Sequence, residues 1–177
     1  MNTAYIGMGG NQASWAGEPA ETLSRALLGL ELLGRVVSHS SLYSTDPVGF
    51  ADQPRFVNAV AALETELSPT ALLAALLEIE RQFGRDRSAS FANGPRTLDL
   101  DILFFDDLEI STGELKIPHP RLAERAFVLV PLAEIVPRLL DPSRGETVEQ
   151  LLSRLLNHSP AELDRVTRVE YEGWLAQ

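Results

Sequence analysis

The chain has 177 residues, of which 45% are hydrophobic and 23% charged, a balance typical of one compact globular domain. This composition excludes a disordered or fibrous chain. The absence of cysteine excludes disulfides, thiolate zinc sites, iron–sulfur clusters and a cysteine nucleophile, and it fits a reducing cytoplasm. We expect neither secretion nor membrane insertion, because the N-terminus lacks signal-peptide features and no uncharged apolar stretch reaches about 18 residues.

The net charge of −10 opposes general attraction to nucleic acids or anionic membranes. Lys116 is the only lysine in the chain, and it does not follow a glycine. A P-loop, which needs a lysine directly after glycine, is therefore absent. Any bound phosphate has to be held by arginine side chains.

The first half of the chain alternates between strand-like and helix-like patterns. An apolar run at 3–8, which ends in two glycines, predicts a strand, and the amphipathic stretch 21–33 predicts a helix. Residues 36–43 and 56–66 are rich in β-branched and aromatic residues and predict two further strands.

The most regular helix pattern covers residues 69–83. It begins after Ser68, a favourable N-cap, and it is followed by Gly84, a favourable C-terminal cap. A loop then leads to a strand pattern at 97–105. The order strand, helix, strand, strand, helix, strand predicts a ferredoxin-like α+β plait, with a mainly antiparallel sheet and helices packed on it.

The remaining chain is less regular. Residues 121–136 and 147–156 have helical periodicity, whereas the last twenty residues have no decisive pattern. The chain contains no internal repeat, polar linker or G-x-G-x-x-G motif. We therefore expect a single domain over residues 1–177.

Two acidic residues alternate with apolar ones in the strand pattern Leu98-Asp99-Leu100-Asp101-Ile102. Strand alternation places both carboxylates on one face of the sheet, where they repel each other unless a cation lies between them. Oxygen ligands completed by substrate phosphates are the usual magnesium arrangement. The alternative is an ordinary polar edge that faces solvent.

Basic and acidic residues separate sharply around this strand. Residues 81–96 contain four arginines and one acid, whereas residues 99–114 contain six acids and no base. This arrangement suits phosphoryl transfer, in which arginines neutralise phosphate oxygens and carboxylates hold the bridging ions. A solvated helix end explains Arg81, but it does not explain Arg96 at the start of the acidic strand.

Two other segments are candidates for ligand contacts. Prolines on both sides of His119 fix the backbone and indicate an imidazole held in a set direction, although a structural role is the alternative. His39 and His158 are interpreted as structural. The loop 46–50, followed by Phe56 and Asn58, combines aromatic rings with an amide, as would suit a flat heteroaromatic ligand or an ordinary buried loop.

Several of these segments together resemble one enzyme family. The stretch Gly94-Pro95-Arg96-Thr97-Leu98-Asp99-Leu100-Asp101-Ile102 resembles the signature of the 6-hydroxymethyl-7,8-dihydropterin pyrophosphokinases of folate biosynthesis. Further blocks resemble the family in the same order, and the resemblance covers residues 3–156. They are Ala4 to Asn11, Ser40 to Gly49, Asp52 to Pro54, Phe56 to Ala59, and Pro118 to Phe127.

The resemblance implies a ferredoxin-like pyrophosphokinase domain that moves the β,γ-pyrophosphoryl group of ATP to the pterin hydroxymethyl oxygen and releases AMP. It implies ATP as co-substrate and two Mg²⁺ ions held by Asp99 and Asp101. The catalytic residues it implies are Arg85, Arg96, Asp99 and Asp101. ATP contacts fall on Arg85, Arg87, Arg96, His119 and Arg125, and pterin contacts on Thr45, Pro47, Val48, Phe56, Asn58 and Phe127.

The chain departs from the family pattern at several positions. Asn93 stands where a tryptophan commonly covers the pterin, with Phe91 two residues earlier. The tail 158–177 matches no family block, and its Tyr171 and Trp174 either cover the sheet or serve a contact between subunits.

Two other functions compete with the family reading: a non-catalytic pterin- or nucleotide-binding module, and a kinase that makes a monophosphate ester and ADP. We expect a cytoplasmic monomer, with a dimer as the alternative.

Overall fold

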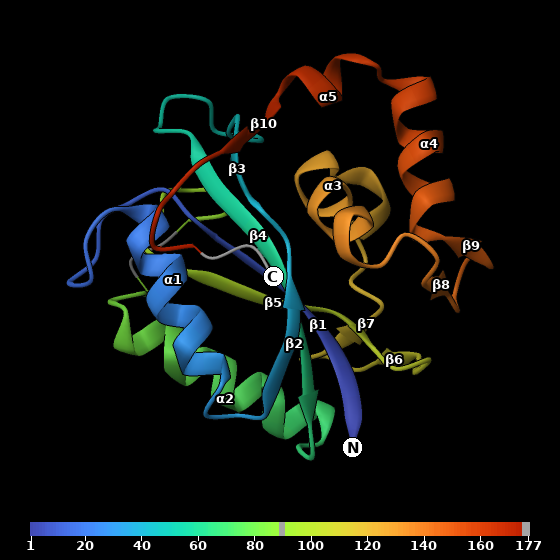
Figure 1. The fold of residues 1–177 in the computed structure, drawn as a ribbon, viewed down its shortest axis with the longest axis horizontal. Coiled ribbons are helices and arrows are strands. Elements are labelled where there is room, and N and C mark those ends of the chain that lie inside the picture. Colours follow the sequence, from blue (N-terminus) through green and yellow to red (C-terminus); the bar gives the residue numbers. More distant parts are fainter. Residues whose placement is uncertain (89–90, 175–177) are drawn as a thin grey trace.

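The computed structural model describes residues 1–88 and 91–174, and its centre is a six-stranded antiparallel sheet (Figure 1). The strands lie in the order β10-β3-β4-β1-β5, and β2 also pairs with β4. Without β10, this is the order expected of the plait, so the predicted α+β fold is confirmed. The strands of the sheet are β1 (Asn2–Gly10), β2 (Arg35–His39), β3 (Leu42–Thr45), β4 (Phe56–Thr65), β5 (Asp99–Phe105) and β10 (Val166–Val169).

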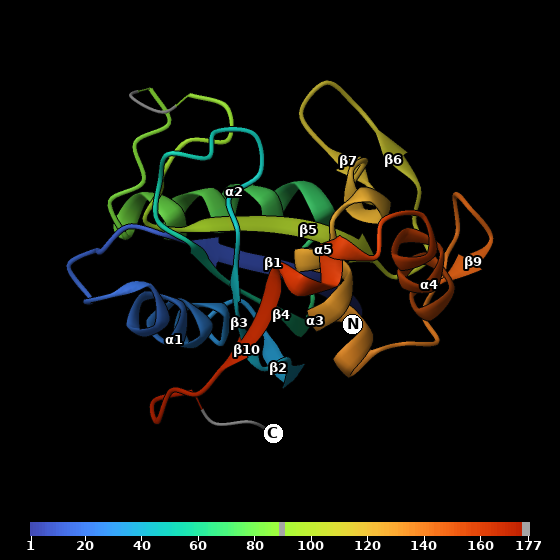
Figure 2. The ribbon, with the colours of Figure 1, turned by 90° about the horizontal axis from the view of Figure 1, so that it is seen from above.

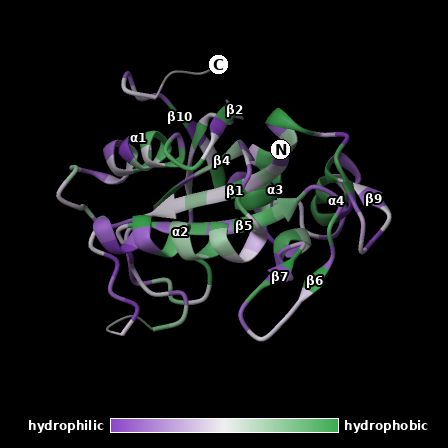
Figure 3. Ribbon diagram, turned by 90° about the horizontal axis from the view of Figure 1, so that it is seen from below, coloured by the Kyte–Doolittle hydropathy of each residue, from purple (hydrophilic) through white to green (hydrophobic). Residues whose placement is uncertain are grey.

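Helices cover both faces of this sheet (Figure 2). The helices α1 (Pro19–Leu30) and α2 (Pro69–Gln82) pack on one face, and α3 (Ala126–Ile135) packs on the other with α4 (Val148–His158) outside it. Helix α3 is apolar along almost its whole length (Figure 3), as expected of a helix enclosed between a sheet and a second helix. A 3₁₀ turn η1 (Leu122–Glu124) precedes α3, and a four-residue helix α5 (Ala161–Asp164) follows α4.

The alternation of side chains along β5 divides the buried residues into two cores. Leu100 and Ile102 pack under α1 and α2, whereas Leu103 and Phe104 pack under α3 and α4. The consecutive residues Leu103 and Phe104 lie on the same face because the pairing of β1 with β5 shifts at this point, where Tyr5 lies opposite Phe104 and Ile6 opposite Ile102. The site-bearing strand is therefore held from both sides.

Several predicted elements have different bounds in the structure, and two of the differences have a clear local cause. Helix α1 ends at Leu30, because residues 31–33 form a turn before β2. The predicted strand 36–43 is two strands, β2 and β3, that both pair with β4. The break lies at Ser40 and Ser41, where the Ser40 hydroxyl accepts from the Val60 amide and the Ser41 amide and hydroxyl donate to Glu134 of α3.

The tail also forms regular structure that the sequence did not predict. Strand β10 pairs with β3 at the edge of the sheet, and Trp174 is buried in the core, where its indole N–H donates to the Ser40 carbonyl at 2.8 Å. Trp174 therefore covers the sheet, which is the first of the two roles considered for the aromatic residues of the tail. Residues 175–177 of the tail lie outside the described residues.

Two short hairpins complete the fold: β6 (Ile110–Ser111) pairs with β7 (Lys116–Ile117), and β8 (Leu140–Asp141) pairs with β9 (Glu146–Thr147). Within the described residues, no helix is long and apolar enough to cross a membrane.

Candidate active site

The two strand carboxylates, Asp99 and Asp101, lie side by side at the end of β5 that faces the loops. Leu98 and Leu100 point to the opposite face, into the core under α1 and α2. Both aspartates line one cleft, here called the carboxylate pocket, so the shared face predicted from strand alternation is present. The carboxylate pocket is lined by Gly7, Met8, Gly9, Asn58, Ala59, Val60, Arg96, Asp99, Asp101, Leu103, Arg125, Phe127 and Val128.

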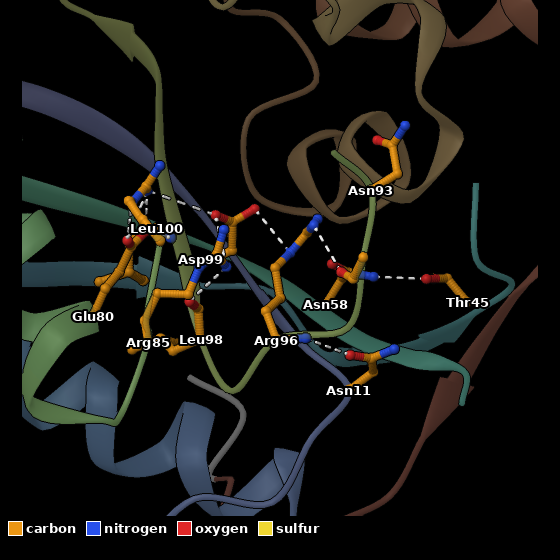
Figure 4. A network of polar contacts seen from close by, with 12 residues as sticks. Asn11, Thr45, Asn58, Glu80, Arg85, Asn93, Arg96, Leu98, Asp99 and Leu100 are labelled. Carbon is orange, nitrogen blue, oxygen red and sulfur yellow. Dashed lines mark hydrogen bonds and ion pairs between the residues drawn. The ribbon is translucent and has the colours of Figure 1, made fainter. Parts of the chain in front are cut away.

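Three of the predicted arginines surround Asp99 (Figure 4). Arg85 Nη1 lies 3.4 Å and Arg87 Nη2 4.0 Å from Asp99 Oδ1, and Arg96 Nε lies 3.2 Å from Oδ2. Arg85 also donates to the Leu98 carbonyl at 3.1 Å, which fixes its guanidinium against the strand. We call Glu80, Arg85, Arg87, Arg96 and Asp99 the charged cluster.

Glu80 is a member of this cluster that the sequence reading missed. It comes from α2 and is almost completely buried, and its carboxylate accepts two hydrogen bonds from Arg87 Nη2 and one from Arg87 Nε. It also accepts the backbone N–H of Leu100 at 2.8 Å, between the two aspartates. Burial raises the pKa of Glu80, and the bonds from Leu100 and Arg87 oppose that shift.

Buried donors in this region lack an acceptor within the described part of the chain. The Nε atoms of Arg85, Arg96 and Arg125 are buried and make no hydrogen bond, and only that of Arg96 has an ion-pair partner, Asp99. Leaving a buried donor unpaired costs about 1–3 kcal/mol, so such groups need an explanation. An anion that reaches all three arginines would supply the missing acceptors.

The two aspartates differ in their electrostatic surroundings. Burial, followed by the neighbouring charge of Asp99, raises the pKa of Asp101 to about 6, and Arg125 opposes the shift. Two adjacent carboxylates, one of which resists ionisation, match the donor set of a divalent cation.

His119 is held as a neutral imidazole. Burial and the charge of Arg125 lower its pKa to about 4. Its Nδ1 accepts the backbone N–H of Arg121 at 3.2 Å, which leaves Nε2 carrying the proton. The backbone of His119 is fixed by its N–H bond to the Leu103 carbonyl of β5. The ring is therefore a hydrogen-bond donor held in a fixed direction, as the flanking prolines indicated.

A second pocket, the aromatic pocket, adjoins the carboxylate pocket. At its floor, the Asn58 amide donates to the Thr45 hydroxyl at 2.6 Å, which orients the amide (Figure 4). Gly9 makes room for Asn58, since a Cβ at Gly9 would lie 2.4 Å from Asn58 Oδ1. Of the predicted pterin contacts, all but Pro47 line this pocket. The aromatic pocket is lined by Thr45, Asp46, Val48, Phe56, Asn58, Asn93, Arg96, Arg125 and Phe127.

Arg96 and Arg125 join the aromatic pocket to the carboxylate pocket, because both line each of them. The Arg96 guanidinium carbon lies 4.9 Å from the Phe56 ring centre, and that of Arg125 lies 5.5 Å from the Phe127 ring centre. Such cation–π contacts hold the guanidinium groups at the boundary between the pockets.

A third pocket opens on the other side of Asp101. Leucines of α2, the apolar residues of β5 and Leu115 just before β7 form its walls, and Arg87, Lys116 and His119 contribute polar groups. We call it the leucine pocket. It is lined by Leu73, Leu77, Arg87, Leu100, Asp101, Ile102, Gly113, Glu114, Leu115, Lys116, His119 and Pro120. Asp101 lines both this pocket and the carboxylate pocket, so the two pockets lie on either side of Asp101.

Comparison with known proteins shows the family of the chain. Residues 5–137 match the model of the 7,8-dihydro-6-hydroxymethylpterin-pyrophosphokinase (HPPK) family. The chain belongs to the HPPK family. The chain is 48% identical over 155 residues to the 2-amino-4-hydroxy-6-hydroxymethyldihydropteridine pyrophosphokinase of Pseudomonas aeruginosa, covering 86% of this chain and 91% of that protein. It is 45% identical over 152 residues to the Bacillus subtilis protein of the same name, covering 84% and 87%.

Solved structures show the same fold. The chain superimposes on the crystal structure of the Plasmodium falciparum HPPK-DHPS S436F/A437G/A613T triple mutant with a TM-score of 0.75 and 16% identity. The match covers 96% of this chain and 47% of that one, so the chain spans about half the length of the solved protein. As an HPPK, the chain is an enzyme of folate biosynthesis that binds ATP and a pterin, and it transfers pyrophosphate from ATP to hydroxymethyldihydropterin.

Proposed function

We propose that the three pockets hold the reacting groups in order: the pterin in the aromatic pocket, the β- and γ-phosphates in the carboxylate pocket, and the adenosine in the leucine pocket. The observation that carries this proposal is the sharing of lining residues. Arg96 and Arg125 belong to the first two pockets and Asp101 to the last two. A pterin hydroxymethyl group at the first boundary would face the β-phosphorus, as in-line transfer requires.

Asp99 and Asp101 would hold the two Mg²⁺ ions. Within the described residues, no group of three or more His, Asp or Glu side chains gathers to form a complete metal site, so phosphate oxygens and water must complete the coordination. The fit rests on the donor chemistry, two carboxylates on one strand face whose mutual repulsion a cation relieves. Bound there, the ions supply charge screening of the polyphosphate and polarise its oxygens.

The protein side chains then position and stabilise the transferred group. The hydroxymethyl oxygen forms a bond to the β-phosphorus and loses its proton to solvent, while the bond from that phosphorus to the α-phosphate bridging oxygen breaks and AMP leaves. The unpaired Nε–H groups of Arg85 and Arg125 donate to phosphate oxygens, and Arg96, which forms an ion pair with Asp99 in the absence of substrate, adds a third guanidinium. His119 donates its Nε2–H to the triphosphate as a neutral group, since its pKa of about 4 keeps it uncharged at neutral pH.

Stacking and edge contacts would select the pterin. The Phe56 and Phe127 rings provide apolar faces, and the fixed amide of Asn58 pairs with the polar edge of a heteroaromatic ring. Thr45 and Val48 complete the floor and rim. Pro47 would act by shaping the loop between Asp46 and Val48, both of which line the pocket.

We further propose that the chain works as a monomeric, single-domain cytoplasmic enzyme. The tail supports the single domain, because β10 extends the central sheet and Trp174 lies in the core. The lack of cysteine supports a reducing compartment.

One incubation tests the assignment of substrates. The protein is mixed with ATP, Mg²⁺ and 6-hydroxymethyl-7,8-dihydropterin, and AMP is resolved from ADP. We expect pterin-dependent AMP. Pterin-dependent ADP would instead indicate a simple kinase, and pterin binding without either nucleotide would indicate a binding module.

A further inference from the structure

The floor of the aromatic pocket lies at the end of a short strand. Thr45, whose hydroxyl orients the Asn58 amide, is the last residue of β3, and Asp46 on the pocket wall follows it directly. The chain then forms the loop 46–55 and returns to the same pocket at Phe56, the first residue of β4. Both ends of this loop therefore carry pocket residues, and their relative position sets the shape of the pocket floor.

The guanidinium of Arg55 joins the two ends of the loop. Arg55 directly precedes Phe56, and its Nε donates to the Ser44 hydroxyl at 2.9 Å while its Nη2 donates to the Ser44 carbonyl at 3.1 Å. Its Nη1 donates to the carboxylate of Asp46, with which it also forms an ion pair. One side chain thus binds both residues that flank Thr45.

The C-terminal tail reaches the same point from the other side of β3 (Figure 1). Strand β10 pairs with β3 so that Val166 lies opposite Thr45. The carbonyl of the preceding residue, Arg165, accepts both the Asp46 amide at 3.2 Å and Arg55 Nη2 at 3.3 Å. The tail lies outside the part of the chain that matches the family model. It nevertheless takes part in fixing the end of β3.

The exposure of these groups indicates a role in positioning more than in stability. The Arg55 and Asp46 side chains are 45% and 43% exposed, and exposed ion pairs contribute little to the stability of a fold. Thr45, by contrast, is buried. The planar guanidinium makes its four contacts from one fixed fork, so it loses little freedom for each bond.

We propose that Arg55, together with the Arg165 carbonyl of the tail, is a clamp that fixes the floor of the aromatic pocket and thereby raises the affinity for pterin. This inference rests on the proposed function, since it takes the aromatic pocket to be the pterin site. Arg55 is not one of the described residues that line the pocket, so it is a positioning residue that acts through Thr45 and Asp46. A site that is held in its binding geometry before the ligand arrives has a lower ordering cost on binding.

Replacing Arg55 tests the clamp. Isothermal titration calorimetry, with a non-hydrolysable ATP analogue and Mg²⁺ present, gives the Kd for 6-hydroxymethyl-7,8-dihydropterin. We expect Arg55→Ala to raise this Kd about three- to fivefold, because the loss of charge-assisted hydrogen bonds loosens the pocket floor. The Kd for the ATP analogue and the midpoint of thermal unfolding should stay unchanged. Arg55→Lys keeps a charge beside Asp46 but loses the planar fork, so its Kd should lie between those of Arg55→Ala and the unaltered chain.

Arg35→Ala is the matched control. Arg35 is also an exposed arginine that pairs with an acid, Glu64, but it does so at the other end of β4. This variant should leave the Kd for pterin unchanged. An unchanged Kd for pterin in Arg55→Ala, or an equal rise in the Kd for the ATP analogue, would overturn the clamp.

Asn58→Ala separates failure of the clamp from failure of the proposed function. If Asn58→Ala weakens pterin binding and Arg55→Ala does not, the aromatic pocket is the pterin site and only the clamp fails. If neither variant affects pterin binding, the assignment of pterin to the aromatic pocket fails, and the clamp fails with it.

Discussion

The aromatic pocket and the charged cluster meet at Arg96, yet their polar groups are satisfied in different ways. In the aromatic pocket, the decisive polar contact is the neutral bond from Asn58 to Thr45, which leaves the amide oriented for a ligand. In the charged cluster, Arg85, Arg87 and Arg96 all turn toward Asp99. The polar contact of the aromatic pocket is already in place without a ligand, whereas under the proposed function the charged cluster would exchange its ion pairs for contacts with phosphate and metal. Charge, metal and pH should therefore act mainly on the nucleotide side of the reaction.

The largest effect should come from removing a carboxylate of the proposed metal pair, Asp99 and Asp101. We expect Asp99→Ala and Asp101→Ala each to lower pterin-dependent AMP formation about a thousandfold, because several kcal/mol of charge stabilisation is lost with the metal. Circular dichroism should show the fold retained. Asp107→Ala, an exposed acid just beyond β5, is the matched control and should keep full activity. Near-normal rates in either active-site variant would contradict the metal assignment.

The charge around Asp101 should also affect how the free energy of unfolding of the metal-free protein depends on pH. The pKa of Asp101 is raised to about 6, so ionising it costs stability as the pH rises from about 4 through 6. Asp101→Asn should therefore be about 2 kcal/mol more stable than the unaltered chain at pH 7.5 and no more stable below pH 4. Denaturant unfolding at several pH values measures this. Equal stabilities at pH 7.5 would contradict the raised pKa.

His119 should have the opposite effect on stability. Its pKa is lowered to about 4, so its contribution is fully present above about pH 6.5 and is lost as the pH falls through 4. Replacement by Gln should flatten the stability curve between those values. His158→Gln, on the surface at the end of α4, is the matched control and should leave the curve unchanged.

Replacing an uncharged side chain of the aromatic pocket should weaken pterin binding and leave ATP binding unchanged. Asn58→Ala removes the edge contact, and we expect the KM for pterin to rise about tenfold with the KM for ATP unchanged. Steady-state kinetics with each substrate varied in turn gives both values. Asn157→Ala on the exposed side of α4 serves as control. A matching rise in the KM for ATP would show that the two regions are not separable.

The smallest effect should come from replacing Glu80, whose carboxylate accepts hydrogen bonds from Arg87. Glu80→Gln keeps an acceptor for the Leu100 amide but loses the charge that fixes Arg87. We expect the KM for ATP to rise about three- to fivefold and the pterin KM to stay the same, because one charge-assisted contact is weakened. Glu78→Gln, exposed on the same helix, should change neither constant.

Local patterns were sufficient to predict the main frame and part of the site. The face shared by Asp99 and Asp101 follows from strand alternation, and the limits of α2 follow from Ser68 and Gly84. Ser68 indeed accepts from the Ala71 amide, and Gly84 adopts a φ of 84°. The sequence alone was informative wherever a structural feature depends on residues that are close together in the chain.

Contacts between distant segments could not be predicted in this way. Glu80 lies four residues after Leu76 on the buried stripe of α2, a position that marks it as buried, but its partners Arg87 and Leu100 are known only from the folded chain. Strand β10 has only four residues and pairs on one side, so its pattern is too short to identify. The break of the predicted strand 36–43 depends on Glu134, more than 90 residues away.

The two tryptophans of the chain lie in contrasting surroundings, which makes them separate optical reporters. Trp174 is enclosed in the core beside His39, whereas Trp15 is 71% exposed, stacks on Phe83 and donates to the Gln82 carbonyl at the end of α2. Iodide in solution should quench the emission of Trp15 and leave that of Trp174 almost unaffected. A shift in the quenchable component would then report events at the root of the loop that carries Arg85, and a shift in the protected component would report release of the tail from the sheet.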